Sequence, residues 1–109
     1  LETTMDSLAS GIMSLTSKII TLLSDRRLKK DISETCDHPY NQIGLKAYTW
    51  SWNDTAFECY GLSGTSQGVI AQEVAAIMPS AVRVDNNGYY MVLYPVIDSL
   101  VDWSDYDGA

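Results

Sequence analysis

The chain has 109 residues, of which 46% are hydrophobic, and it carries a formal net charge of −7. A single small domain of this size buries only a modest core, so we expect association with further copies to stabilise it. The acidic balance argues against nucleic acid and anionic membranes as partners, because binding to phosphates requires clustered Lys and Arg side chains.

The first segment, residues 1–23, repeats an apolar residue at alternating steps of three and four positions. The series consists of Met5, Leu8, Ile12, Leu15, Ile19 and Leu22. This heptad spacing predicts a helix with one narrow apolar stripe, which would pair with copies of itself as a coiled coil. These a and d residues lean towards two strands, but three heptads that contain Gly11 leave the copy number open. The alternative is an amphipathic helix packed on its own domain.

Residues 1–23 do not resemble a membrane or export segment. They lack the basic start and the continuous apolar stretch of a signal peptide. No apolar run of the chain approaches the roughly 20 residues of a bilayer-spanning helix. We therefore expect a soluble chain that is not exported and that has no membrane partner.

A change of character follows Leu23. Ser24 and Asp25 form a pair that can cap a new helix or a turn. The next residues hold four of the seven Lys and Arg of the chain, at Arg26, Arg27, Lys29 and Lys30. Such a run is usually a solvated face, but in an acidic chain it suggests a local electrostatic role.

The middle of the chain predicts a sheet and one helix. The alternation in residues 43–52 is typical of a strand or hairpin with an aromatic face. Residues 53–67 are rich in Gly, Ser and Thr without a period and predict a flexible loop. Residues 69–78 predict a short amphipathic helix, which Pro79 ends and which packs on the sheet.

The last third predicts a hairpin and a helix. Residues 81–84 and 89–94 flank Asn86-Asn87-Gly88, a sequence that favours a tight turn between two strands. Residues 95–103, with Pro95 in the first turn, predict a final helix. The predicted fold class is therefore α+β, with an N-terminal coiled-coil helix, a small antiparallel sheet with one packed helix, and a C-terminal helix.

Several side chains could carry chemistry. Cleavage of a peptide bond needs a nucleophile and a base, which Ser24 and Lys29 could supply if burial or nearby positive charge lowered the pKa of the lysine. Their five-residue spacing does not identify a site, because residues on one helix face lie three or four apart. Cys36 and His38 offer an alternative Cys–His pair or zinc site, although tetrahedral zinc needs further ligands. We expect reduced thiols at Cys36 and Cys59, and neither a metal nor a cofactor.

Two blocks of the sequence resemble a known family. Ser24–Ile32 (SDRRLKKDI) is similar to the opening signature of the phage intramolecular chaperones, the S74 peptidase family, found on endosialidase tailspikes, tail fibres and neck appendages. Gly68–Val74 (GVIAQEV), followed by Pro79 and by a strand, a turn and a strand ending in Tyr94, resembles the later block of the family. The resemblance extends to about Leu100. It implies that residues 1–23 are the end of a fibre stalk or a helical lead-in and that residues 24–109 form a homotrimeric chaperone domain.

The resemblance implies a self-cleaving function. Ser24 and Lys29 would be the catalytic dyad and Leu23–Ser24 the bond that is cut, with Asp25 and Arg26 either supporting the site or only capping and pairing locally. The domain would assist folding and trimerisation of an upstream fibre or tailspike of the same chain in the cytoplasm of the infected host. After autoproteolytic release it would be absent from the mature virion tail. The alternative is a structural trimer cap that stays attached.

The remaining conspicuous side chains are expected to be structural. Gln72 and Glu73 stand at the start of the predicted helix, where such residues are ordinary. The aromatic residues are expected to form core and subunit contacts. They are Tyr48, Trp50, Trp52, Tyr89, Tyr90 and Tyr94.

Overall fold

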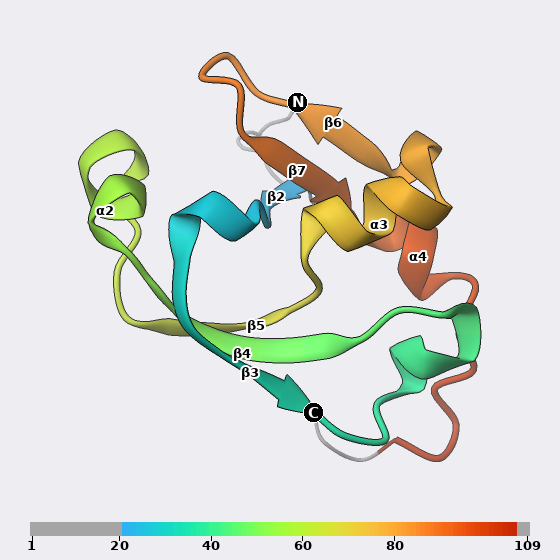
Figure 1. Ribbon diagram of the computed structural model, residues 1–109. Coiled ribbons are helices and arrows are strands. Elements are labelled where there is room, and N and C mark those ends of the chain that lie inside the picture. Colours follow the sequence, from blue (N-terminus) through green and yellow to red (C-terminus); the bar gives the residue numbers. More distant parts are fainter. Residues whose placement is uncertain (1–20, 107–109) are drawn as a thin grey trace, which may run out of the picture.

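The computed structural model describes residues 21–106, which form two small antiparallel sheets connected by short helices (Figure 1). The first sheet has the strand order β2 (Thr21–Leu23), β7 (Tyr90–Leu93) and β6 (Val82–Val84). The second has the order β3 (Lys29–Thr35), β4 (Ala47–Trp52) and β5 (Thr65–Gly68). The predicted α+β class is confirmed. The single sheet is wrong, because the β6–β7 hairpin pairs with β2 and not with the aromatic strand β4.

Within residues 21–106, six short helical segments connect and cover the sheets. The α-helices are α2 (Asp54–Tyr60), α3 (Ala71–Ile77) and α4 (Tyr94–Asp98). The 3-10 helices are η1 (Arg26–Leu28), η2 (Pro39–Ile43) and η3 (Pro79–Ala81). Helix α3 contacts both strands of the β6–β7 hairpin, so the predicted packing of this helix on a sheet is confirmed. None of the helices within residues 21–106 is long and apolar enough to cross a membrane.

The heptad segment meets the described structure only at its end. Residues 1–20 lie outside the described residues, and the predicted coiled coil and trimer stay predictions. Thr21–Leu23 form strand β2, which pairs with β7 and places Leu22 opposite Val92, so the helix prediction is wrong for these three residues. Pairing with β7 satisfies their backbone groups through another strand, which a hydrophobic repeat cannot reveal.

The predicted loop over residues 53–67 is also wrong, because it contains α2 and β5. The side chain of Asn53 caps α2 by accepting a hydrogen bond from Ala56 N at 3.0 Å. Gly61 ends the helix in the left-handed conformation. Helix α2 has only 7 residues, too few to show a sustained period. Strand β5 is polar and is defined by its ladder with β4.

Other boundaries were predicted more closely. The hairpin between β6 and β7 is confirmed, with Gly88 in the turn at a φ of 85° and the Asp85 carboxylate accepting from the backbone of Asn87 and Tyr89. Strand β4 begins at Ala47, after η2. Helix α4 ends at Asp98 and is shorter than the predicted helix. The Trp103 indole donates to the Asp98 carbonyl at 3.0 Å.

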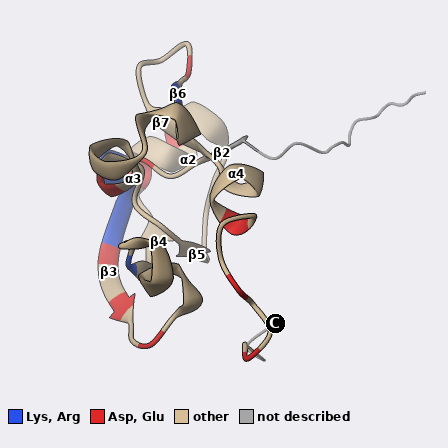
Figure 2. Ribbon diagram, turned by 90° about the vertical axis from the view of Figure 1, so that its right-hand side faces the viewer, with Lys and Arg blue, Asp and Glu red and all other residues tan. Residues whose placement is uncertain are grey.

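The core joins α3 and α4 to both sheets. Its buried members come from segments far apart in the sequence, and they are Tyr40, Leu45, Ala47, Val69, Ala71, Val74, Ala81, Val92, Ile97 and Val101. Figure 2 shows basic residues at the start of β3 and acidic residues farther along the same strand. The basic side chains of Arg26, Arg27, Lys29 and Lys30 therefore gather at the junction between β2 and β3.

Candidate functional site

Ser24 lies directly after β2, where backbone bonds hold it on two sides. Its N–H donates to the Tyr90 carbonyl at 3.1 Å, which extends the pairing of β2 with β7. Its own carbonyl accepts from Ala71 N, the first residue of α3, at 2.9 Å. The Ser24 side chain is fully buried. The residue is therefore fixed between a strand and the start of a helix.

Lys29 reaches Ser24 because the short helix η1 folds the intervening residues back. Lys29 Nζ lies 3.0 Å from Ser24 Oγ and donates to the Val69 carbonyl at 2.8 Å. The same nitrogen lies 3.5 Å from the centre of the Trp50 ring. Only 6% of Lys29 is exposed. The short helix η1 therefore brings Ser24 and Lys29 together, although their five-residue spacing gave no such indication in the sequence.

The surroundings of Lys29 favour its neutral form. Burial is the largest effect and lowers its pKa from 10.5 to about 7, because an ammonium loses hydration in the interior. The negative charges of Asp25 and Glu73 oppose this shift, and the positive charge of Arg26 adds to it. Like the two carboxylates, the Trp50 ring attracts the ammonium form and so opposes the shift. Near neutral pH a large fraction of Lys29 is therefore an amine that can accept a proton.

The hydroxyl of Ser24 has a complete set of hydrogen-bond partners. It donates a short hydrogen bond to the Val69 carbonyl, the acceptor that it shares with Lys29. It also lies 3.3 Å from the Tyr94 hydroxyl. Rotation of the Ser24 proton from Val69 to the neutral Lys29 amine would convert this arrangement into a nucleophile with an adjacent base.

Asp25, the residue after Ser24, is a fully buried carboxylate in the segment that connects β2 to β3. It accepts from the backbone and guanidinium of Arg27, from Gln72 Nε2 at 2.7 Å and from Tyr90 N at 2.9 Å. Burial alone would raise the pKa of Asp25, but these hydrogen bonds outweigh it and hold the pKa well below its usual range. Asp25 also caps η1, so local capping and support of the junction are combined in one side chain.

The two sequence blocks interlock beside this carboxylate. Arg26 N donates to Gln72 Oε1 at 2.9 Å, and its guanidinium lies 3.4 Å from Glu73 Oε2. Glu73 in turn accepts from the Tyr48 hydroxyl at 2.8 Å. Through these contacts, Gln72 and Glu73 attach α3 to the residues that follow Ser24.

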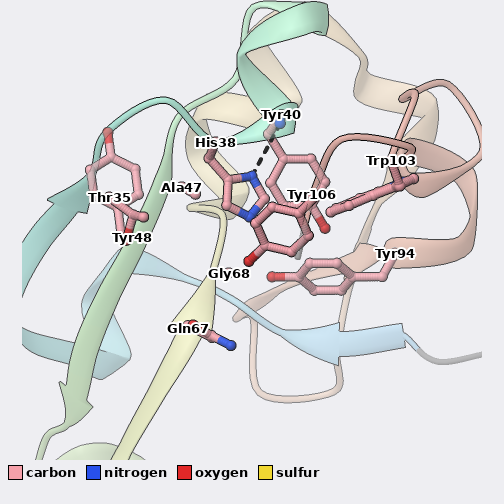
Figure 3. Close-up of a pocket in the computed structure, with 10 residues that line it drawn as sticks. All are labelled: Thr35, His38, Tyr40, Ala47, Tyr48, Gln67, Gly68, Tyr94, Trp103 and Tyr106. Carbon is pink, nitrogen blue, oxygen red and sulfur yellow. Dashed lines mark hydrogen bonds between the residues drawn. The ribbon is translucent and has the colours of Figure 1, made fainter. Parts of the chain in front are cut away.

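The alternative Cys–His site has a different arrangement. His38 Nδ1 accepts from Tyr40 N at 3.1 Å and caps η2, and burial lowers its pKa. Figure 3 shows this bond and the ring of His38 among Tyr40 and Tyr106. Cys36 and Cys59 are exposed free thiols. Within residues 21–106 no three His, Cys, Asp or Glu side chains form a group that could hold a metal ion.

Tyr94, whose hydroxyl group contacts Ser24, lines two cavities. One, of about 260 Å³, is the aromatic pocket of Figure 3 and includes Gly68 and His38. The other, of about 480 Å³, is lined by Leu22, Leu23 and Trp50 among others. Leu22 and Leu23, which precede the predicted cleavage position, therefore border open space, whereas Ser24 is buried and lines neither cavity.

These features define a small α+β domain with a buried serine–lysine pair at its N-terminal junction. Residues 24–83, more than half of the chain, match the family model described as chaperone of endosialidase, peptidase S74. The chain therefore belongs to this family. The match begins at Ser24, the first residue after β2.

Other comparisons are more limited. A segment of 74 residues, 63% of this chain, is 34% identical to the long tail fiber protein Gp37 of Salmonella phage S16. It spans 9% of the length of that protein. No solved structure gives a significant match.

Sequence reasoning did not find several residues of the site. Trp50 and the Val69 carbonyl contact Lys29, and the Tyr94 hydroxyl contacts Ser24, yet Trp50 and Tyr94 were expected only to form core and subunit contacts. Gly68, which precedes Val69 and Ile70, could have indicated this part of the site, because glycine within a strand often marks a place where another group approaches the backbone closely.

Proposed function

We propose that this chain is an intramolecular chaperone domain, which assists folding and trimerisation of an upstream phage tail fibre and then leaves by cutting the Leu23–Ser24 bond. Membership of the chaperone of endosialidase family and similarity to a tail fiber protein support the chaperone role. The observation that carries the cleavage is the buried Lys29 Nζ, 3.0 Å from Ser24 Oγ and with a pKa of about 7.

The first step is a transfer of the Leu23 acyl group within the junction. The neutral amine of Lys29 takes the proton of Ser24 as Oγ attacks the Leu23 carbonyl carbon. The resulting Lys29 ammonium returns a proton to Ser24 N, and the carbon–nitrogen bond breaks. The products are a Leu23 ester on Ser24 Oγ and a free Ser24 amine. Because the Tyr90 carbonyl holds Ser24 N at 3.1 Å, the amine stays at the junction.

The second step is hydrolysis. Water adds to the ester carbonyl, the bond from carbon to Ser24 Oγ breaks, and Leu23 ends as a carboxylate. Cutting would make assembly irreversible, since the mature fibre could not return along a route that needs the chaperone. Assembly would take place in the cytoplasm of the infected host, with the mature fibre in the virion tail and without this domain.

Substitution of the two proposed catalytic residues tests the cleavage. In the unaltered chain, a denaturing gel and mass spectrometry should detect residues 1–23 and 24–109 as separate fragments. Ser24→Ala and Lys29→Ala should each remain intact. The matched controls Ser33→Ala and Lys30→Ala, exposed positions on β3, should still be cut. Normal cleavage in either Ser24→Ala or Lys29→Ala would refute the dyad.

The chaperone role has a separate test. The parent fibre, expressed with and without residues 24–109, should form its native trimer only when these residues are present, as measured by light scattering. A fibre that trimerises equally well without them would contradict this role.

One observation favours a second function, a structural trimer cap that stays attached. The Ser24 proton is directed to the Val69 carbonyl and not to Lys29, an arrangement in which the hydroxyl is not activated. A single uncut band from the unaltered chain, together with a normal fibre trimer, would favour the cap over self-cleavage.

A further inference from the structure

Tyr94 places its hydroxyl group beside the proposed nucleophile. The residue begins α4 directly after β7, and its ring extends towards Gly68 (Figure 3). The Tyr94 hydroxyl lies 3.3 Å from Ser24 Oγ and accepts a hydrogen bond from Val69 N at 3.0 Å. It is thus held by the backbone of one segment while it contacts the side chain of another.

Gly68 makes this approach possible. Its φ of 154° lies in a region that side chains rarely adopt, and a Cβ atom at this position would overlap the Tyr94 hydroxyl oxygen. The same Cβ would lie 3.3 Å from the Trp50 ring, which covers Lys29. The Tyr94 hydroxyl can therefore occupy this position only because residue 68 has no side chain.

The directions of the hydrogen bonds assign the Tyr94 proton. Ser24 has one hydroxyl proton, and it goes to the Val69 carbonyl. Tyr94 is therefore the donor in its contact with Ser24 Oγ, because the only Ser24 hydroxyl proton is already used in the bond to Val69. Burial raises the pKa of Tyr94, so the hydroxyl keeps its proton at neutral pH.

We propose that Tyr94 is a further catalytic residue, the proton donor to Ser24 Oγ when the Leu23 ester is hydrolysed. The inference rests on the proposed self-cleavage. In this step Lys29 acts as base and takes a proton from the attacking water, so it cannot at the same time protonate the leaving oxygen. As the bond from the Leu23 carbon to Oγ breaks, its electron pair stays on Oγ, which takes the Tyr94 proton.

The protons then return to their starting positions. The Lys29 ammonium restores the Tyr94 proton through the Ser24 hydroxyl, which both side chains contact. The Leu23 carboxylic acid loses its proton to solvent. Water has space near the reacting bond, because the cavity of about 480 Å³ is lined by both Leu23 and Tyr94.

Tyr94→Phe in the complete chain tests this role. We expect ester formation to change little and ester hydrolysis to slow on the order of 100-fold, the lower end of the usual effect of a general acid. The ester should then accumulate, and hydroxylamine should convert it to a Leu23 hydroxamate that mass spectrometry detects on the fragment of residues 1–23. Tyr40→Phe is the matched control, since it removes a buried hydroxyl that binds Asp98 and not Ser24.

The outcomes separate the two proposals. Cleavage of Tyr94→Phe without ester accumulation, or equal slowing of both steps, would overturn the role of Tyr94 and leave self-cleavage intact. Failure of the unaltered chain to cleave would instead reject self-cleavage, and the role of Tyr94 with it. If Tyr94→Phe does not fold by circular dichroism, Gly68→Ala decides, because it displaces the hydroxyl and should also accumulate the ester. A folded Gly68→Ala chain without ester accumulation would overturn the role.

Discussion

Replacement of Lys29 by methionine should stabilise the fold and remove part of its pH dependence. The experiment uses a Ser24→Ala background, which removes the proposed nucleophile, and compares it with Ser24→Ala/Lys29→Met. An unfolded lysine titrates at 10.5, whereas Lys29 in the folded protein has a pKa of about 7. Between these values the unfolded chain binds a proton that the folded chain does not, so stability should rise with pH in this window.

The magnitude follows from the shift. Each pH unit inside the window changes the free energy of unfolding by up to about 1.4 kcal/mol. From pH 7 to pH 10, Lys29 should therefore contribute a rise of about 3 to 4 kcal/mol that the methionine variant lacks. The advantage of methionine should accordingly be largest at pH 7 and shrink as the pH rises. Only 6% of Lys29 is exposed, so solvent screening removes little of this effect.

Urea unfolding, followed by tryptophan fluorescence at pH 7, 8, 9 and 10, measures the difference. Protein concentration is kept constant, because association also shifts apparent stability. Other groups that titrate at alkaline pH are shared by both chains and cancel. Lys46→Met in the same background is the control that removes a charge from an exposed position. Parallel stability curves for the chains with and without the Lys29→Met substitution would refute burial as the cause of the lowered pKa.

Three further predictions concern the same domain. The cleavage rate, measured in gel time courses, should rise about tenfold per pH unit from pH 5 to pH 7 and stay constant above pH 7, because only neutral Lys29 is a base. A cleavage rate that does not change with pH would contradict this. Asp25→Asn should lower the free energy of unfolding in urea by about 2 to 3 kcal/mol and move the midpoint of the cleavage profile to lower pH, since Asp25 raises the pKa of Lys29. An upward shift would be inconsistent with that effect. Asn53→Ala should cost about 1 to 2 kcal/mol in urea unfolding, because it removes the cap of α2 and the hydrogen bond that Asn53 Nδ2 donates to the Arg27 carbonyl in η1. It should also slow cleavage, and an unchanged cleavage rate would show that this bond to η1 does not help to position Lys29.

Local chemistry in the sequence was sufficient for several elements. The hairpin around Gly88 and helix α3 before Pro79 were predicted, because turn residues and helix breakers act through their own backbone. The resemblance of two sequence blocks to the family also directed attention to Ser24 and Lys29. It could not say how near these side chains lie or what covers them.

Pairing partners could not be read from the chain. The heptad pattern gives no indication that Thr21–Leu23 pair with β7, a strand near the other end of the chain. The polar strand β5 likewise exists through its hydrogen bonds with β4 and shows no hydrophobic alternation. Strand pairing depends on which strand edge lies beside a given segment in space, and this is decided only when the chain folds.

The junction itself was located by the sequence, but its electrostatics belong to the tertiary structure. Ser24 and Lys29 come from one short segment, whereas Trp50, Val69 and Tyr94 reach them from three distant ones. A lysine has an ordinary pKa in an isolated peptide, and only its removal from water can lower that pKa to about 7. The sequence, through its resemblance to a family, thus singled out this serine and lysine, and the packing around them decided their separation and the lowered pKa of the lysine.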